Sequence, residues 1–346
     1  MKSNLSPAAS PIGQKKTAKN FFMQYAIYLV LFCIIIVIVA LDPSFLSMRN
    51  ITNILQQAAT KLVIALGAAG ILVLGGTDLS AGKAVGMAGI ICASLLQDPS
   101  YSLRIYSNMP QLSLIVPFLI AAACCVIFGV AHSYLVSTLR IAPFIASLGM
   151  QMVIYGSMSL YFEGVNNSSP IGGLDPRYTS VAQGSFYLGS LRVPYIVLYA
   201  IVIAVLFWVL WNRTRLGRNM FAVGGNSEAA EVSGVSVTKT IMGVFLYAGL
   251  MYGIASFLEG ARIQSVGTAT GINYELDAIA GCVIGGVSFN GGIGTVPGVV
   301  IGSIILQAIN YGLYFLGVNA YLQYIIRGAI IIIAVAIDVQ KYVAKK

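Results

Sequence analysis

The sequence predicts an all-α polytopic membrane protein with about ten transmembrane helices, some of them broken or re-entrant. Three observations support this fold class. Hydrophobic residues make up 58% of the 346 residues, charged residues make up only 9%, and the mean hydropathy is +0.86. A soluble domain carries roughly 25% charged residues, so the composition favours insertion into a bilayer. Finally, apolar runs fill the chain and confine most polar residues to short gaps.

Ten apolar runs define the predicted crossings. The first follows a basic tail and extends for about 20 residues, which is enough to cross a ~30 Å hydrocarbon core and longer than the core of a cleavable signal peptide. The predicted crossings are 22–41, 51–74, 85–96, 112–139, 144–162, 195–211, 240–258, 276–286, 296–316 and 325–339. The polar segment 163–194 is the largest outside segment and has room for short helices. An even number of crossings places both chain ends on the same side.

The net charge of +9 indicates membrane topology rather than nucleic-acid binding, because the basic residues gather in three places. Positively charged loops translocate poorly and stay on the cytoplasmic side. Eleven of the twenty Lys and Arg residues are Lys2, Lys15, Lys16, Lys19, Arg213, Arg215, Arg218, Lys239, Lys341, Lys345 and Lys346. We therefore expect a cytoplasmic tail over 1–20, a single transmembrane domain over 21–340 with a cytoplasmic loop at 212–240, and a cytoplasmic tail over 341–346.

The sequence contains no constellation that is typical of a membrane enzyme. All five cysteines lie in apolar runs without a CxxC pair, and we interpret them as small buried residues. The single histidine, His132, lies within a predicted crossing, and neither an HExxH motif, a Walker-type loop nor a nucleophile elbow occurs. We therefore expect no catalytic residue, no metal site and no cofactor bound by this chain, and transport is the favoured function.

A secondary carrier that works alone is the alternative class of transporter. Carriers coupled to protons or sodium ions keep several ionisable groups within the membrane. Here the candidates in the middle of crossings are Asp78, Lys61, Lys83 and His132, which is a small set for ion coupling.

Two glycine-rich segments, 75–82 and 285–294, interrupt the apolar runs. Polar backbone at membrane depth is tolerated only where it is buried in protein or lines water, so both segments are candidates for a substrate passage. Within the first segment, Asp78 or Ser80 caps the helix that follows or lines the passage, and the two roles are compatible.

The second glycine-rich segment supplies hydroxyl, aromatic and amide groups in Ser288, Phe289 and Asn290, which suit a polyol. An internal repeat also connects the two segments. Laying Val73–Gln97 over Val283–Gln307 at a constant offset of 210 gives seven identities in 25 positions. Transporter halves often meet at corresponding broken helices, although glycine-rich apolar sequence also produces such matches by chance.

The pattern of residues 224–235 predicts one short helix in the cytoplasmic loop. Asn226 or Ser227 caps its start, Glu228 and Glu231 suit the positive end of the helix dipole, and Gly234 ends it in a left-handed turn. Such a helix suits the docking of a cytoplasmic partner, and an ordinary surface loop would show the same pattern.

Four stretches resemble the permeases of ABC importers of the ribose/galactose type. They are the Gly-Gly-Asn-x-Glu-Ala-Ala-x-x-Ser-Gly loop at 224–234 and the segments 75–82, 143–149 and 285–292. The resemblance extends from about Leu41 to the C-terminus. Segments 274–280 and 324–332 are most similar to the galactose/methyl-galactoside branch of this family.

This resemblance implies a type II importer permease in the bacterial inner membrane, assembled as a homodimer with the substrate path along its two-fold axis. It implies a cytoplasmic ATPase that uses ATP and magnesium, and an extracytoplasmic sugar-binding protein that docks on the short, flat outside loops. Ribose, another sugar or a nucleoside remain alternative substrates, and selectivity is expected to lie largely in the binding protein. Thr77 and Ser147, which vary in the family, settle nothing about the substrate.

We predict two groups of functional residues. The group that contacts the ATPase is Asn226, Ser227, Glu228, Ala229, Ala230, Glu231, Val232, Ser233 and Gly234. The group that lies near the passage is Asp78, Ser80, Phe144, Ser288, Phe289 and Asn290. A bulky charged residue at Ala230 is expected to uncouple transport while the permease still folds.

Overall fold

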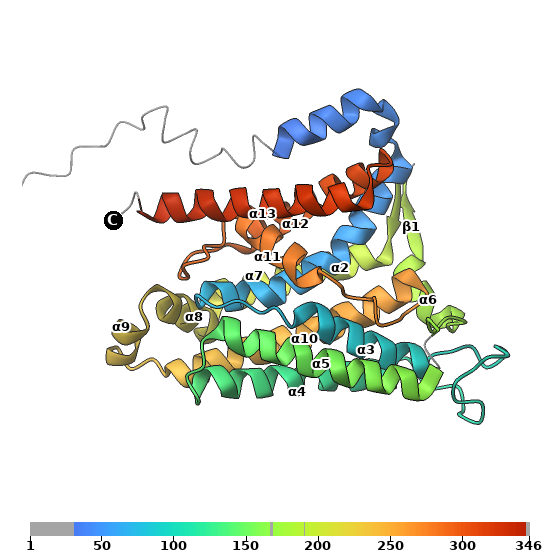
Figure 1. The fold of residues 1–346 in the computed structure, drawn as a ribbon, viewed down its shortest axis with the longest axis horizontal. Helices are drawn as coiled ribbons and strands as arrows, with labels where there is room; N and C mark the ends of the chain where they lie inside the picture. The colour runs from blue at the N-terminus through green and yellow to red at the C-terminus, as the bar shows by residue number, and fades with distance from the viewer. Residues whose placement is uncertain (1–30, 167–168, 190, 344–346) are drawn as a thin grey trace, which may run out of the picture.

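Within residues 31–166, 169–189 and 191–343, which this computed structural model describes, ten helices that form a bundle lie mostly side by side (Figure 1). They are Leu31–Leu41, α2 (Met48–Val73), α3 (Ala81–Leu95), α4 (Ile115–Ser137), α5 (Pro143–Asn166), α7 (Tyr195–Arg213), α10 (Val237–Ile263), α11 (Tyr274–Ile284), α12 (Val296–Phe315) and α13 (Ala320–Val343). Seven of these are long and apolar enough to cross a membrane, whereas Leu31–Leu41, α3 and α11 are shorter. The all-α polytopic fold class is therefore confirmed.

The two ends of this bundle differ. One end carries α8 (Arg215–Gly225), α9 (Ser227–Val232) and the C-terminal end of α13, at the left of Figure 1. The other end carries the 3-10 helix η1 (Pro43–Leu46), α6 (Pro176–Gln183) and the strands β1 (Ser185–Leu188) and β2 (Leu191–Pro194). The 212–240 loop and the end of α13 therefore share a side, as the charge pattern predicts. The tail 1–20, the start of the first crossing at Phe22 and residues 344–346 lie outside the described residues.

The outside segment 163–194 contains one short helix, as predicted, and a β-hairpin that was not predicted. Strands β1 and β2 pair antiparallel in the register Ser185↔Pro194 to Leu188↔Leu191. Gly189, with φ of +63°, occupies the left-handed region that the tight turn requires. Strands of four residues are too short for a clear alternation of apolar and polar residues, so the pattern gave no signal.

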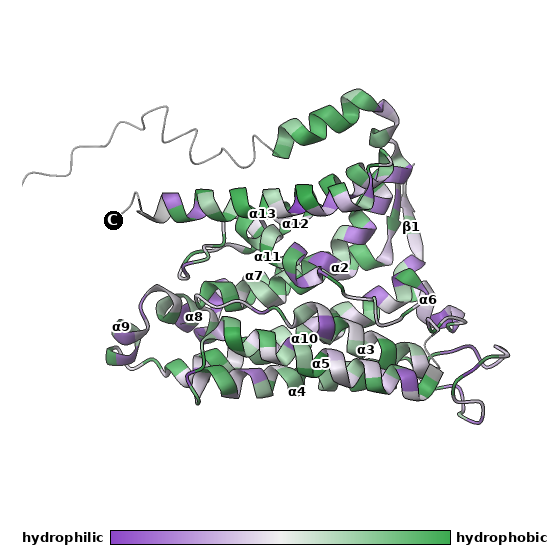
Figure 2. Ribbon diagram, in the orientation of Figure 1, coloured by the Kyte–Doolittle hydropathy of each residue, from purple (hydrophilic) through white to green (hydrophobic). Residues whose placement is uncertain are grey.

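Helices α2 and α10 form the centre of the bundle and are the most buried of the seven long apolar helices. Small residues allow them to approach each other, because a Cβ on Gly67 would lie only 3.0 Å from the Tyr252 ring. Helix α4 packs on α10 in the same way, with Gly249 against the Cys125 carbonyl. By contrast, α4, α5, α7 and α13 leave most of their surface uncovered, and the bundle helices are predominantly green in Figure 2.

Two helices in the bundle are broken. After α2 the chain is non-helical from Leu74 to Ser80, and α3 spans only about 22 Å at 1.5 Å per residue, less than a full crossing. After α10 the chain is irregular over 264–273 before the eleven residues of α11. The first turns of α3 pack against the second interruption, because a Cβ on Gly86 would lie 2.5 Å from the Thr270 carbonyl oxygen. Broken helices are thus present as predicted.

The predicted repeat is displaced in the structure. Helices α2 and α11 end in the same motif, with Gly75 at φ +79° and Gly286 at φ +84°. In each case the glycine donates its N–H to the carbonyl three residues earlier. These equivalent glycines are 286 − 75 = 211 positions apart, rather than 210, and the helices that follow begin 296 − 81 = 215 positions apart. The similarity is therefore local to the helix ends.

Candidate functional site

The loop between α8 and α10 contains the predicted short helix, α9. It covers Ser227–Val232 rather than the whole of 224–235, because α8 continues to Gly225. Asn226, and not Ser227, caps it: its Oδ1 accepts a hydrogen bond from the Ala229 N–H at 2.9 Å. Gly234, with φ of +83°, ends the turn as predicted.

The surface of α9 offers contact positions to a partner, with one exception. Ala230 is only 5% exposed, whereas Glu228, Glu231 and Val232 are exposed, Val232 to 91%. A charged residue at Ala230 would therefore disturb the packing of α9 on its own protein. The burial of Ala230 argues against the expectation that such a variant still folds normally, because this face of α9 already packs against the rest of the protein.

Three glycine-containing segments meet beneath α9, and we call Val73–Gly76, Gly224–Gly225 and Asn290–Gly292 the glycine junction. The Gly292 N–H donates to the Val73 carbonyl at 2.8 Å. A Cβ on Gly224 would overlap the same carbonyl, and a Cβ on Gly291 would lie 2.6 Å from the Gly224 carbonyl oxygen. The junction is thus backbone against backbone. It joins the end of α2, the end of α8 and the segment between α11 and α12.

The segment that follows α11 is anchored to α13 by a residue that the sequence analysis missed. Asp338 Oδ2 accepts hydrogen bonds from Ser288 Oγ at 3.1 Å and from the Phe289 N–H at 3.0 Å. Ser288 is buried, whereas Phe289 and Asn290 are exposed. A signal was available, because Asp338 is the sole acidic residue in the predicted crossing 325–339.

Asp78 lies inside the bundle and holds the turn before α3. Its Oδ1 accepts hydrogen bonds from the Ser80 N–H at 2.8 Å and from Ser80 Oγ at 2.6 Å. His132 Nδ1 on α4 lies 3.7 Å from the same oxygen, and His132 packs against the Phe245 ring. The side chains of Asp78 and His132 are both almost fully buried. The predicted side-chain cap of α3 is therefore wrong: Ser80 occupies the N-cap position without a capping bond, and Asp78 holds the preceding turn through Ser80 instead.

The six predicted passage residues do not form one cluster. Asp78, Ser80 and Ser288 are buried, whereas Phe144 is 54% exposed and Phe289 and Asn290 are also exposed. Pro143, next to Phe144, touches the glycine junction, since a Cβ on Gly76 would lie 3.1 Å from its Cβ. That these residues line a passage remains a prediction.

A group of charged side chains lies between α2, α10, α11 and α13, and the sequence analysis did not bring it together. Its members, which we call the charged column, are Lys61, Glu259, Arg262, Tyr274, Asp277 and Arg327. Lys61 Nζ lies 3.2 Å from Asp277 Oδ2, and Arg327 Nη1 lies 3.9 Å from Asp277 Oδ1. Arg262 Nη2 binds Glu259 at 2.7 Å, and the Tyr274 hydroxyl donates to Glu259 at 2.5 Å. Spacing along the chain could not reveal contacts between residues 61, 277 and 327.

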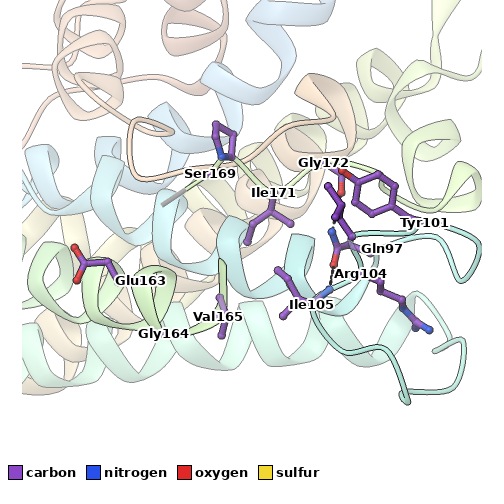
Figure 3. A pocket seen from close by; sticks show the side chains of 12 residues that line it. Gln97, Tyr101, Arg104, Ile105, Glu163, Gly164, Val165, Ser169, Ile171 and Gly172 are labelled. Carbon is purple, nitrogen blue, oxygen red and sulfur yellow. Dashed lines mark hydrogen bonds between the residues drawn. The ribbon is translucent and has the colours of Figure 1, made fainter. Parts of the chain in front are cut away.

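The end of the bundle opposite α9 is hollowed, which corrects the expectation of a flat outside face. A pocket of about 530 Å³ lies between the loop that follows α3 and the segment that follows α5 (Figure 3). Gln97 connects its walls, donating to the Gly172 carbonyl at 2.9 Å and accepting from the Ile105 N–H at 2.8 Å. Arg104 and Glu163 lie well apart along the pocket in Figure 3.

Comparison with known proteins places this geometry in context. The family described as "Branched-chain amino acid transport system / permease component" matches residues 50–335. The galactose/methyl galactoside import permease protein MglC of Haemophilus influenzae is 47% identical over 335 residues, which covers 96% of this chain and 99% of that protein. The protein of the same name from Escherichia coli is 46% identical over 332 residues, with 96% and 98% covered. The ribose import permease protein RbsC of Bacillus subtilis is 34% identical over 314 residues, with 91% and 92% covered. No solved structure matches the chain.

Proposed function

Since the chain belongs to the family of branched-chain amino acid transport system permease components, we propose that it is the membrane subunit of an ABC importer for galactose or methyl galactoside. The chain is a multi-pass membrane permease. The proposed sugar follows three relatives named for galactose/methyl galactoside that are 45% to 47% identical, above the 34% of a ribose permease; a fourth relative of that name is 36% identical.

The observation that carries the proposed mechanism is the glycine junction. Helix α9 is capped and largely exposed, and the end of α8, which leads directly into it, is joined to α2 and to the segment after α11 by backbone contacts. Such contacts leave no flexible side chain between them to absorb a displacement, and packed interfaces move as rigid bodies. A push on α9 by a partner would therefore move both membrane segments together.

The partners follow from this mechanism. A cytoplasmic ATPase subunit binds ATP and magnesium, hydrolyses the nucleotide and contacts residues 226–234, while this chain binds no cofactor. An extracytoplasmic sugar-binding protein docks at the end that carries η1, α6 and the hairpin, where the hollow near Gln97 offers a recess for one of its loops. A second copy of the chain completes a passage along the two-fold axis in the bacterial inner membrane, with both chain ends in the cytoplasm.

In this proposal the predicted passage residues act at two depths. Phe144, Phe289 and Asn290 are exposed near the glycine junction and face the passage at its cytoplasmic end. Asp78, Ser80 and Ser288 are buried and fix the backbone of the broken segments behind it. Ribose, another sugar or a nucleoside as substrate, and a carrier that works alone, are the alternatives.

Reconstitution tests the proposed function. The permease, its ATPase and the sugar-binding protein are placed in proteoliposomes, and uptake of radiolabelled galactose, ribose and a nucleoside is measured. We expect ATP-dependent galactose accumulation that vanadate abolishes and that ionophores leave unchanged. Uphill transport by the permease alone under an ion gradient would overturn the proposal, and ATP-driven uptake of ribose in preference to galactose would overturn the assigned sugar.

A further inference from the structure

The charged column places ionisable groups deep in the bundle. Lys61 is the fourteenth of the 26 residues of α2, about 20 Å from either end of that helix. The Lys61 side chain is 13% exposed, that of Asp277 11% and that of Arg327 28%. Charged groups at this depth are costly in lipid, so they face the interior, water or a ligand. The exposed parts of these three side chains are therefore not expected to contact lipid acyl chains.

An open face of the bundle adjoins this column. On α11 and the segment before it, Leu276 is 40% exposed and Ile272 is 45% exposed. On the neighbouring α3, Lys83 is partly exposed and lies 4.5 Å from the centroid of the Tyr155 ring of α5, which is 44% exposed. We call this face the polar wall. It comprises Lys83, Tyr155, Leu276 and the partly exposed members of the charged column, Lys61, Asp277 and Arg327. It thus combines cations, a carboxylate and an aromatic ring with a few aliphatic groups.

The uncovered surface of α4 is different. Ile127, in the middle of α4, is 66% exposed, and the exposed large residues around it include Leu119, Ile120 and Val130. Such a surface matches acyl chains, and the polar wall does not. The same bundle therefore has one kind of face for lipid and another that suits water and polar solutes.

Two polar atoms at the polar wall lack partners among the described residues. Glu275 is 6% exposed, yet its Oε2 makes no hydrogen bond, and the same is true of Nε of Arg327. Glu275 lies against Gly82, next to Lys83, so it borders the polar wall from behind. Buried polar atoms are nearly always hydrogen-bonded, so these two atoms leave hydrogen-bonding capacity unused beside the polar wall.

The charges of the wall nearly balance. The cations Lys61, Lys83, Arg262 and Arg327 stand against the acids Glu259, Glu275 and Asp277. A nearly neutral set of donors and acceptors favours a neutral ligand with many hydroxyl groups over an anion. The exposed ring of Tyr155 provides an apolar face of the kind on which the C–H side of a pyranose packs.

We propose that the polar wall, formed by Lys83, Tyr155, Leu276 and the partly exposed members of the charged column, Lys61, Asp277 and Arg327, is a hexose-binding surface in the middle of the substrate passage. The inference rests on the proposed function and adds a site to it. The wall offers exchangeable hydrogen bonds to a sugar that has left its binding protein, so the sugar crosses the membrane without full loss of its hydration.

Cysteine accessibility tests the position of the wall. Leu276→Cys is introduced into a variant in which Cys33 and Cys124, which are not fully buried, are replaced by alanine. The matched control is Ile127→Cys, which is exposed at a similar depth on the apolar surface. In the reconstituted importer, we expect a charged thiol reagent to modify Leu276→Cys in at least one nucleotide state and not Ile127→Cys. Galactose delivered by the binding protein should slow that modification severalfold. No modification in any state, or modification that galactose does not slow, would overturn the inference.

Removal of one charge tests the chemistry. Lys83→Met deletes a partly exposed cation that has a ring contact and no ion pair within the described residues, so the fold should persist. The control, Arg49→Met, removes an exposed cation at the outer end of α2. For Lys83→Met we expect the number of ATP molecules hydrolysed per galactose imported to rise about tenfold, as one hydrogen bond to a charged group is lost.

A purely structural role for Lys83 would lower uptake and ATP hydrolysis together, and an unchanged ratio would overturn the inference. Because the unsubstituted importer is measured in parallel, its failure to accumulate galactose would instead reject the proposed function.

Discussion

At the scale of single residues, Gly224 shows how little room the glycine junction leaves. Its Cα lies so close to the Val73 carbonyl that any side chain would overlap it. Gly225, the next residue, has nothing within 4 Å of the position that a Cβ would take. Gly224 and Gly225 thus have different surroundings, although nothing in the sequence distinguishes the two adjacent glycines.

We expect Gly224→Ala to force the ends of α2 and α8 apart and to destabilise the permease by about 1–3 kcal/mol, as overpacking usually does. ATP-driven galactose uptake should fall with it, because the displaced junction no longer transmits movement from α9. Thermal unfolding in detergent and uptake in proteoliposomes are the measurements. Gly225→Ala is the control and should leave both close to the parent; equal behaviour of the two variants would contradict a tight junction at Gly224.

Asp175, on the outside face, provides a second prediction at this scale. It caps α6 by accepting from the Arg177 N–H at 2.8 Å, and it also accepts from Gln111 at 2.8 Å. Hydrogen bonds from the Arg177 side chain lower the pKa of the Asp175 carboxyl below its ordinary value. A carboxyl whose pKa is lowered by folding stabilises the fold above the pKa of the unfolded chain, near 3.9, and loses that effect as pH falls through the folded value.

We therefore expect Asp175→Ala to cost about 1 kcal/mol, mainly through the lost cap, because the exposed Arg177 contributes little as an ion pair. The difference in thermal stability between parent and variant should be the same at pH 7 and pH 5, and it should shrink only below about pH 4. If the difference in thermal stability between parent and variant already disappears at pH 5, the Asp175 carboxyl is not held in its charged form by the fold.

At the scale of elements, α9 is the clearest case of local prediction. Its capping residue, its terminal glycine and its place in a basic loop are all short-range features, and all are confirmed, with Asn226 as the cap. The burial of Ala230 was not foreseen, because a helix of six residues has too few positions to reveal which side packs. The hairpin, the role of Asp338 and the charged column depend on contacts between distant segments, which periodicity does not encode.

The exposed side of α9 supports a sharper test than Ala230 does. Val232 is 91% exposed, so Val232→Asp adds a charge without disturbing the packing of the helix. We expect this variant to unfold at the same temperature as the parent and to reach the membrane in equal amount. Galactose uptake and ATP hydrolysis stimulated by the binding protein should both fall about tenfold, since a charge in the centre of a packed interface costs more than 1.4 kcal/mol. Full activity would mean that the ATPase docks elsewhere.

The broken helices show the limit of hydropathy at the scale of elements. The sequence predicted crossings at 85–96 and 276–286, and helices α3 and α11 lie there, but α3 begins at Ala81 and α11 at Tyr274. Apolar runs locate a helix without giving its depth or its true start. The depth comes from neighbours, here from the contact of Gly82 and Gly86 with the irregular chain at Thr270 and Gly271.

At the scale of the whole molecule, the proposed mechanism requires a definite arrangement in the membrane. α9 must face the ATPase, and the hairpin must face the binding protein, so an odd number of crossings must separate Glu228 from Tyr187. Among the described residues between them, α7 is the one helix with the length and hydropathy of a crossing, since α8 is short and β2 is a strand. The charge pattern gave the same orientation from sequence alone, because it depends on the sum of many residues rather than on any contact.

Labelling from one side of the membrane tests this arrangement. Glu228→Cys and Tyr187→Cys are both exposed positions, the second with a parent side chain 71% exposed. In intact cells made permeable only at the outer membrane, an impermeant thiol reagent should modify Tyr187→Cys and spare Glu228→Cys, and in inverted vesicles the pattern should reverse. Cys33, the exposed native cysteine, is replaced by alanine in both variants. Modification of both positions from the same side would mean that α7 does not cross the bilayer. The junction beneath α9 would then have no membrane passage to control, and the ATPase and the sugar would meet the same face of the protein.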